Sequence, residues 1–272
     1  MTEIDSLKQT IEKYGLSPKK SLGQNFILDP RILDKIAKSA GPLMGTHVLE
    51  IGPGPGGLTR ALLANGATVT VIEKDERCIA ALEELRTFYP DKLTILNKDA
   101  LQINYPKLLK HPTRIVANLP YYVASQILVH LLKEIHAPKN NILSLTLMFQ
   151  KEVAKRITAL PGAKDYGRLA ILSNWLCTTK ILFDLSPGSF FPAPKVTSSL
   201  VQFTPKPEPF PADFKGMETL TQLAFSQRRK MIKATLKDYP LADLGIDPTK
   251  RPENLTIEEF VKLCYTGRTK KQ

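Results

Sequence analysis

An amide, a proline and two tyrosines follow one another in the run Asn118-Leu119-Pro120-Tyr121-Tyr122. The exocyclic amine of a nucleobase is a weak nucleophile, because its lone pair is drawn into the ring. Two acceptors that hold the amine hydrogens direct this lone pair toward an electrophilic methyl group, and the Asn118 side-chain oxygen and the Pro120 carbonyl suit that role. Tyr121 is placed to stack on the base. The run therefore predicts methyl transfer to an amine, driven by positioning and polar preorganisation without a prior general base.

A glycine-rich turn, Gly52-Pro53-Gly54-Pro55-Gly56-Gly57, follows an apolar run and precedes a helical pattern. Its glycines satisfy G-x-G-x-x-G, and Glu73 lies about 20 residues downstream, as in dinucleotide sites. However, the two prolines of the turn lack the N–H groups on which a pyrophosphate cradle depends. A nucleoside without phosphates fits better. S-adenosylmethionine is such a ligand, because its methionine end carries its own ammonium and carboxylate groups.

Two carboxylates are placed to complete this site. Glu73 ends the second β-rich run, where it can accept hydrogen bonds from the ribose hydroxyls. Asp99 follows the third run, where it can accept from the adenine amino group. Either acid alone is more often a solvated loop charge or a helix cap. The glycine turn and both acids, at the ends of successive strands, together predict a ligand site at one edge of a sheet.

The elements that must position these residues follow an alternating pattern. Short β-rich runs occur at His47–Ile51, Thr68–Glu73, Leu93–Asn97, Arg114–Asn118 and Ile142–Phe149. Helical periodicity separates them at Thr59–Leu63, Glu76–Leu85 and Ser125–Ile135. This alternation predicts an α/β fold with a mostly parallel sheet and helices on both of its faces. Two later runs, Lys180–Leu185 and Thr197–Phe203, have no helix between them, so we expect antiparallel neighbours at one edge.

The two ends of the chain lack this alternation of strands and helices. Near the N-terminus the pattern predicts helices at Ser6–Tyr14 and at about Pro30–Ala40, the second capped by Asp29. Four prolines within residues 204–211 predict a stiff linker. Helical patterns follow at Phe214–Lys237 and Thr256–Cys264. We therefore expect a methyltransferase domain at residues 1–205 and a small all-α, RNA-binding domain at residues 206–272.

The charge balance favours a polyanionic partner. Lys and Arg number 38 against 26 Asp and Glu, which gives a net charge of +12. The segment Ser226–Lys237 holds five bases and no acid, which is typical either of phosphate contact or of a solvated helix face. The residues that we expect to contact RNA are Lys19, Lys20, Arg228, Arg229, Lys230 and Lys233.

Cysteine usage and hydropathy exclude several classes of protein. Cys78, Cys177 and Cys264 are odd in number and far apart, so they build neither a disulfide framework nor a CxxC metal site. The N-terminus carries acids where a secretory signal carries bases, and no apolar run is long enough to cross a bilayer. We expect a cytoplasmic monomer without a metal ion and without a membrane partner.

Four motifs together resemble one family. They are Ser21-Leu22-Gly23-Gln24-Asn25-Phe26-Ile27, Glu50-Ile51-Gly52-Pro53-Gly54, Asn118-Leu119-Pro120-Tyr121 and Phe190-Phe191-Pro192-Ala193-Pro194-Lys195-Val196. In this order, across roughly residues 15 to 205, they resemble the small-subunit ribosomal RNA adenine dimethyltransferases, the KsgA family of bacteria. The whole set is highly specific, whereas the glycine turn alone is not.

The resemblance implies a fold, a substrate and roles for named residues. The implied fold is a Rossmann-like class I methyltransferase sheet, mostly parallel with one antiparallel edge strand. A family member transfers methyl groups from S-adenosylmethionine to N6 of two adjacent adenosines, in a hairpin near the 3′ end of 16S rRNA, and dimethylates each. The implied cofactor pocket consists of Asn25, Ile27, Gly52, Glu73, Asp99 and Asn118. Phe190 is implied to close on the target adenine opposite Tyr121, although core packing is the alternative. Ile27 stands where leucine is usual, a swap that conserves volume.

Two other functions remain open at this point. One is methylation of a large-subunit rRNA adenine, as in the related antibiotic-resistance enzymes, which the Gly23-Gln24-Asn25-Phe26 stretch and the Phe190–Val196 loop disfavour. The other is a non-catalytic, RNA-binding assembly factor that keeps the same fold.

Overall fold

The structure is a computed structural model that describes residues 4–267, apart from the side chain of Lys20. It consists of two compact units. One comprises the chain up to residue 151 together with residues 180–204, and the other comprises residues 152–179 together with the chain from residue 205. The break after residue 204 falls at the proline-rich segment. The second unit differs from the expected C-terminal domain because it also takes in residues 152–179.

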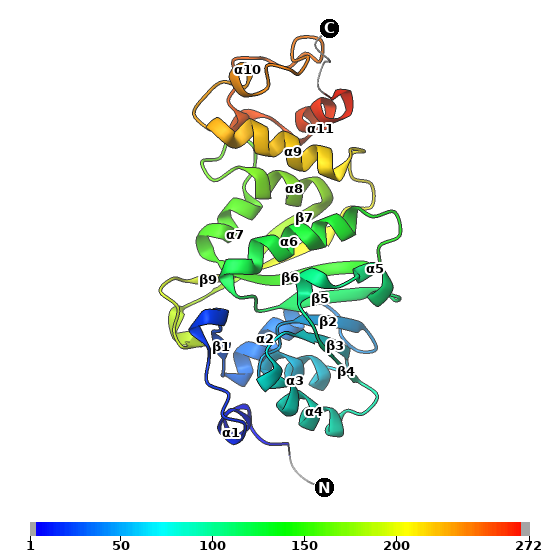
Figure 1. Ribbon diagram of the computed structural model, residues 1–272, viewed down its shortest axis with the longest axis vertical. Helices are drawn as coiled ribbons and strands as arrows, with labels where there is room; N and C mark the ends of the chain where they lie inside the picture. The colour runs from blue at the N-terminus through cyan, green and yellow to red at the C-terminus, as the bar shows by residue number, and fades with distance from the viewer. Residues whose placement is uncertain (1–3, 268–272) are drawn as a thin grey trace. The chain divides into compact units, whose positions relative to one another are not determined.

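A seven-stranded sheet has the strand order β4-β3-β2-β5-β6-β9-β7 (Figure 1) and belongs to the first unit, except for residues 177–179 of β7 and Pro205 of β9. Its strands are β2 (His47–Ile51), β3 (Thr68–Glu73), β4 (Leu93–Asn97), β5 (Thr113–Ala117), β6 (Ile142–Gln150), β7 (Cys177–Leu185) and β9 (Ser198–Pro205). The five from β4 to β6 are parallel, and β9 runs antiparallel to β6. The α/β fold predicted from the alternating pattern and the Rossmann-like class implied by the resemblance are confirmed. The antiparallel strand β9 lies one place in from the edge strand β7.

Helices cover the sheet because its strands are apolar on both faces, as parallel strands require. The helices after the first strands are α3 (Gly57–Ala64), α4 (Ile79–Phe88), the short α5 (Tyr105–Leu108) and α6 (Tyr121–His136), with 3-10 turns at Glu76–Cys78 and Ala100–Gln102. Figure 1 shows α3 and α4 beside β2, β3 and β4. Residues of α2 (Pro30–Ser39), α3 and α4 share one buried cluster with β2 and β3.

The N-terminal segment adds elements that pack against this core. Helix α1 (Leu7–Lys13) begins at Ser6, whose hydroxyl and Gln9 form a capping box. Helix α2 begins after Asp29, whose carboxylate accepts from the Arg31 N–H, so the predicted cap is confirmed. Between the helices, a 3-10 turn (Lys20–Leu22) leads into the short strand β1 (Phe26–Ile27), which pairs antiparallel with β8 (Phe190–Phe191). This small sheet joins the motif at residues 21–27 to the motif at residues 190–196.

The second unit is helical. Its helices are α7 (Lys151–Thr158), α8 (Arg168–Leu176), α9 (Phe214–Ala224), α10 (Ile232–Thr235) and α11 (Ile257–Thr266), and Lys151 alone of these residues belongs to the first unit. The second unit also has 3-10 turns at Phe225–Gln227 and Pro252–Asn254. The 3-10 turn at Pro187–Ser189 belongs to the first unit. The prediction of one helix over Phe214–Lys237 is wrong, because α9 ends at Ala224. The Ile232 N–H donates to the Lys250 carbonyl and the Lys233 N–H to the Pro248 carbonyl, so this backbone bonds to a distant loop. That arrangement buries Ile232 fully.

Within residues 4–267, no helix has the length and apolar content needed to cross a bilayer.

Candidate active site

A cavity of about 260 Å³ lies in the first unit at the carboxyl ends of β2, β3 and β5. Four stretches line it: residues 22–27 before and within β1, the glycine turn after β2, residues 72–75 at the end of β3, and the run around Asn118. Residues 98–101 after β4 complete the wall. Open α/β sheets bind their ligands at this edge, where loops from successive strands converge. Almost every predicted site residue of this unit therefore meets in one cavity.

The glycine turn shapes the floor of the cavity. Gly52 and Gly54 have φ angles of 69° and 55°, which favour glycine. A Cβ atom at Gly52 would meet no atom within 4 Å, so the backbone there faces open space. A Cβ at Gly54 would lie 3.0 Å from the Phe26 ring, so glycine lets β1 approach the turn closely. The turn thus offers a bare backbone surface to a ligand.

Glu73 is held by the backbone around it. One carboxylate oxygen accepts from the Gly54 N–H at 2.9 Å and the other from the Asp75 N–H at 2.7 Å. The side chain is buried, and this burial raises the pKa of Glu73, although the two N–H groups oppose the shift. A carboxylate oxygen has more than one lone pair, so each oxygen can still accept a ligand hydroxyl. Glu73 is therefore preorganised as an acceptor.

Asp99 lies in the next loop along the same edge. Its carboxylate accepts from the Lys74 ammonium at 2.7 Å and from the Leu101 N–H at 3.0 Å. The Lys74 hydrogen bond is the main cause that holds the pKa of Asp99 below its usual value. Asp99 is thus an ionised acceptor on the wall of the cavity, at the place expected for the adenine contact.

Glu50 is a cavity residue to which the sequence analysis assigned no role. It is 1% exposed, and one carboxylate oxygen accepts from the Thr59 hydroxyl at 2.6 Å. Burial raises the pKa of Glu50 to about 8, against the effect of the Thr59 hydrogen bond. In the sequence, Glu50 could have been singled out because it is an acid within an otherwise apolar run, directly before the glycine turn. A buried carboxyl group with a strongly raised pKa in a cleft is a candidate functional residue.

Glu50 leads to a prediction about stability and pH. The folded protein keeps the Glu50 proton up to about pH 8, whereas the unfolded chain releases it near its ordinary pKa of 4.5. Stability therefore falls as the pH rises from 4.5 to 8, by at most about 5 kcal/mol from this group. In Glu50→Gln, we expect a smaller loss of melting temperature between pH 5 and pH 8, measured by calorimetry without added ligand. An equal loss in both proteins would contradict a protonated Glu50.

Asn118 is oriented by the N-terminal segment. Its side-chain amide nitrogen donates to the Asn25 backbone carbonyl at 3.0 Å, and the Asn25 side chain in turn donates to the Gly23 carbonyl. Because the NH₂ group is used in this way, the Asn118 amide oxygen is the atom left to accept from a ligand. Asn25 thus contributes a backbone carbonyl that fixes the orientation of Asn118.

The predicted role of the Pro120 carbonyl needs correction. This oxygen accepts from the N–H groups of Val123 and Ala124, both at 3.1 Å, because Pro120 caps the first turn of α6. The carbonyl is therefore engaged within the helix. The Leu119 carbonyl accepts no hydrogen bond from the residues that the structure describes. We expect this oxygen to be the second acceptor for an amine.

The aromatic residues of the two motifs differ in accessibility. The Tyr121 hydroxyl and the Ser198 hydroxyl lie 2.5 Å apart, so a hydrogen bond to β9 fixes the half-buried Tyr121 ring in the cavity wall. Phe190 is 6% exposed, belongs to the core cluster and is not one of the described residues that line the cavity. Its neighbour Phe191 is 55% exposed. The role of Phe190 against a target base stays a prediction, because its ring would first have to leave the core.

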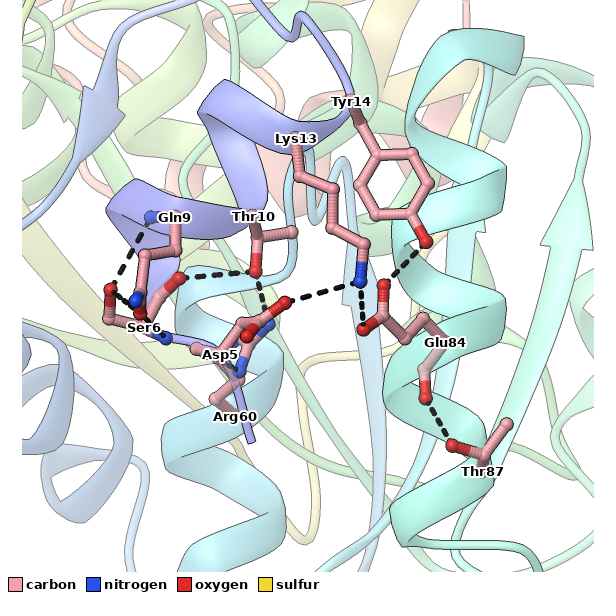
Figure 2. A network of polar contacts seen from close by, with 9 residues as sticks. All are labelled: Asp5, Ser6, Gln9, Thr10, Lys13, Tyr14, Arg60, Glu84 and Thr87. Carbon is pink, nitrogen blue, oxygen red and sulfur yellow. Dashed lines mark hydrogen bonds and ion pairs between the residues drawn. The ribbon is translucent and has the colours of Figure 1, made fainter. Parts of the chain in front are cut away.

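Polar contacts fasten the start of the chain to α3 and α4 (Figure 2). Arg60 of α3 donates to the Asp5 carbonyl at 2.8 Å and to the Thr10 hydroxyl at 2.9 Å. Glu84 of α4 accepts from the Lys13 ammonium at 2.7 Å and from the Tyr14 hydroxyl at 2.5 Å. These contacts hold α1 in place, and Leu7 of α1 lines the cavity. The N-terminal segment is therefore a structural part of the site.

The predicted RNA contacts fall in both units. Lys19 is exposed in the first unit, and the Lys20 side chain lies outside the described residues. Arg228, Arg229, Lys230 and Lys233 are exposed in the second unit, and the Arg228 guanidinium donates to the Lys164 carbonyl. Their exposure is compatible with phosphate contact. Residues 4–267 contain no group of three or more potential metal ligands, and the cysteines in this range are unpaired.

Comparison of the sequence with a family model and with curated proteins finds the same kind of ribosomal RNA methyltransferase. The family model described as "Ribosomal RNA adenine dimethylase" matches residues 15–265. The chain is 49% identical over 271 residues to ribosomal RNA small subunit methyltransferase A of Mesorhizobium japonicum, covering 96% of this chain and 97% of the relative. It is 50% identical over 269 residues to the protein of the same name from Bartonella tribocorum, with coverage of 96% and 97%.

Solved structures agree at the level of the fold. A dimethyladenosine transferase from Plasmodium falciparum superposes with a TM-score of 0.74 and 29% identity, covering 86% of this chain and 94% of that one. The 23S rRNA methyltransferase ErmE superposes with a TM-score of 0.67 and 27% identity, covering 89% and 99%.

Proposed function

Because the chain belongs to the ribosomal RNA adenine dimethylase family, we propose that it transfers methyl groups from S-adenosylmethionine to N6 of adenosine in small-subunit ribosomal RNA. The observation that carries this proposal is the orientation of Asn118, whose amide nitrogen is bound to Asn25 so that its oxygen is available to an amine. We expect the reaction to take place in the cytoplasm and the enzyme to act as a monomer without a metal ion.

The cavity suits the cofactor in shape and chemistry. The bare backbone at Gly52 can approach the methionine end, and the buried Glu73 carboxylate can accept the ribose hydroxyls. Asp99 can accept from the adenine amino group, and Asn25 and Ile27 supply wall contacts from the N-terminal segment. When bound, S-adenosylmethionine supplies an electrophilic methyl group on its sulfonium. The protein's own contribution is to hold that group in line with the attacking nitrogen.

The adenine amine would be held by acceptors. The Asn118 oxygen and the Leu119 carbonyl are expected to accept its two hydrogens, which directs the nitrogen lone pair at the methyl group. Tyr121, fixed by Ser198, would stack on the ring, and Phe190 remains a predicted second aromatic contact. Methyl transfer would form the N–C bond and break the S–C bond, and the nitrogen would then release its extra proton to solvent. No described side chain is needed to remove that proton before attack.

We propose two adjacent adenosines near the 3′ end of 16S rRNA as the substrate, each dimethylated. Curated relatives at about half identity are named for the small subunit, which favours this over the large subunit, although a 23S rRNA methyltransferase shares the fold. Mass spectrometry of small-subunit rRNA from cells with and without the protein tests the proposal. Loss of dimethyladenosine from this RNA supports it. Loss from 23S rRNA would indicate the other substrate, and no loss would indicate a non-catalytic assembly factor.

We propose that the second unit binds RNA through the basic segment, residues 226–237. Each phosphate contact releases counterions, so each lost contact lowers the slope of log affinity against log salt by about 0.7–0.9. Replacing Arg228, Arg229 and Lys230 by Gln should weaken binding to small subunits and flatten this slope by about two. Filter binding at several salt concentrations measures it. S-adenosylmethionine affinity should not change.

A control variant separates this effect from net charge. Lys215 and Lys262 are exposed on α9 and α11 of the same unit, and replacing both by Gln should change the salt slope little. If the triple variant keeps the wild-type slope, the basic segment is a solvated surface. The RNA contacts must then be sought around Lys19 and Lys20.

A further inference from the structure

The exposed residues on the cavity wall form a small, chemically distinct group. Most of the lining is buried or half-buried. Among the described residues that line the cavity, Lys74, Lys98 and Tyr122 are the exposed ones. Two cations beside an aromatic ring form the combination with which proteins hold single-stranded nucleic acid, by phosphate attraction and base stacking. We call these three residues the rim group.

Tyr122 is supported from within the protein. It lies in the first turn of α6, next to the half-buried Tyr121, and its side chain is 66% exposed. A Cβ atom at Gly23 would lie 3.1 Å from one atom of the Tyr122 ring, and Gly23 has a φ angle of 60°. The N-terminal segment therefore runs directly against one part of the ring. A large aromatic side chain that is supported on one part and otherwise open to solvent can receive a base at little entropic cost.

The two tyrosines point in different directions because successive residues of a helix are about 100° apart. Tyr121 is tied to Ser198 at 2.5 Å in the cavity wall, whereas Tyr122 is open to solvent. A base that stacks on the solvent-facing part of Tyr122 would therefore lie at the rim of the cavity, whereas the reacting base is expected inside it beside Tyr121.

The lysines provide charge on the same rim. Lys74 donates to the Asp99 carboxylate at 2.7 Å, and its side chain is 69% exposed, so its ammonium lies at the solvent side of this wall. Lys98 makes no ion pair with the residues that the structure describes. Its ammonium is available to a phosphate.

We propose that Tyr122 is a stacking platform for the RNA base next to the target adenosine, and that Lys98 contacts the phosphate backbone there. This inference rests on the proposed function and extends it, because it assigns the site that holds the RNA outside the reaction cavity. The adjacent base is the second adenosine while the first reacts, so the platform also keeps the next substrate close to the cavity.

The test compares three substitutions at one position. Tyr122→Phe keeps the ring, Tyr122→Leu keeps apolar bulk without a π system, and Tyr122→Ala removes both. Loss of one base stack weakens binding about fivefold or more. We expect KM for unmethylated small subunits to rise at least about fivefold in the Ala and Leu variants, with wild-type values in Phe. The affinity for S-adenosylmethionine, measured by calorimetry, should be the same in all four proteins.

A spectroscopic measurement reports stacking directly. A short RNA hairpin with 2-aminopurine in place of the adenosine beside the target changes its fluorescence when that base stacks on a ring. We expect this change with wild-type protein and Tyr122→Phe, and its loss with Tyr122→Leu. Lys98→Gln should lower the salt slope of hairpin binding by about 0.7, the value for one single-strand phosphate contact.

The outcomes distinguish this proposal from the proposed function. If the wild-type protein methylates small subunits while Tyr122→Ala and Tyr122→Leu keep the wild-type KM and fluorescence change, the platform is wrong and the function stands. If Tyr122→Ala weakens S-adenosylmethionine binding without raising KM for RNA, Tyr122 covers the cofactor instead, which also overturns the proposal. If wild-type protein methylates neither RNA, the proposed function itself has failed.

Discussion

Asn118→Ala is expected to reduce the methylation rate about 100-fold or more, while affinity for small-subunit RNA changes little. The Asn118 oxygen interacts with the amine most strongly as the nitrogen lone pair develops toward the methyl group. An acceptor of this kind acts in the transition state more than in the ground state, so its loss lowers kcat more than it raises KM. Single-turnover methylation of unmethylated small subunits measures the rate.

A second substitution at this position separates charge from orientation. Asn118→Asp keeps an oxygen acceptor but loses the amide hydrogen bond to the Asn25 carbonyl. It also places a carboxylate beside that carbonyl oxygen, so the side chain should turn away and the rate should fall as well. Asn104 caps α5 and is not one of the described residues that line the cavity, so Asn104→Ala serves as the control and should keep the wild-type rate.

Asn118→Ala can also lose some affinity for S-adenosylmethionine without contradicting the catalytic role of Asn118, because Asn118 lines the same cavity as Glu73. A methylation rate close to that of the wild type would contradict this role. If Asn118→Ala retains more than about a third of the wild-type rate under single-turnover conditions, the amine is activated by other groups.

Glu73→Ala is the second large effect, and we expect at least a tenfold loss of S-adenosylmethionine affinity. Hydrogen bonds to a charged acceptor contribute about 1.5–3 kcal/mol each, and the carboxylate is preorganised to accept two hydroxyls. Isothermal titration calorimetry measures the affinity. The melting temperature must be measured beside it, because the substitution leaves the N–H groups of Gly54 and Asp75 without their acceptor.

Two further variants sharpen this test. Glu73→Gln keeps the shape and one acceptor oxygen but loses the charge, so we expect intermediate affinity. Glu76→Ala removes an exposed acid from the same loop and should leave affinity unchanged. Calorimetry that shows wild-type affinity in a folded Glu73→Ala protein would remove Glu73 from the cofactor site.

The fold, and the gathering of most candidate site residues in one cavity, were predictable from the sequence because local signals carry them. Strands β2, β3 and β4 have the bounds that the apolar runs predicted, since buried parallel strands are read as short continuous runs. The Asp29 cap and the start of α2 follow from residue types within one turn. The cavity brings together Gly52, Glu73 and Asp99 because the carboxyl ends of parallel strands meet at one edge.

Other features depend on contacts between segments far apart in the chain, and only the tertiary structure decided them. Strand β1 forms because it pairs with β8, and neither two-residue segment carries a periodicity of its own. The helix expected over Phe214–Lys237 ends at Ala224. Further along, the N–H groups of Ile232 and Lys233 donate to the carbonyls of Lys250 and Pro248, which lie far along the chain. Residues 152–179 join the second unit through packing that no local pattern encodes.

The same division holds for the atoms of the site. The residue types at positions 118–122 determined the chemistry that this protein can perform, because an amide oxygen, backbone carbonyls and aromatic rings suit an amine on a base. The tertiary structure decided which of these atoms are available. In the folded chain the Asn118 nitrogen donates to the Asn25 carbonyl, and the Pro120 carbonyl accepts from N–H groups in the first turn of α6. Tyr122 remains exposed. A hydrogen-bond acceptor or a ring is available only when nothing else in the fold occupies it, and that depends on the whole chain.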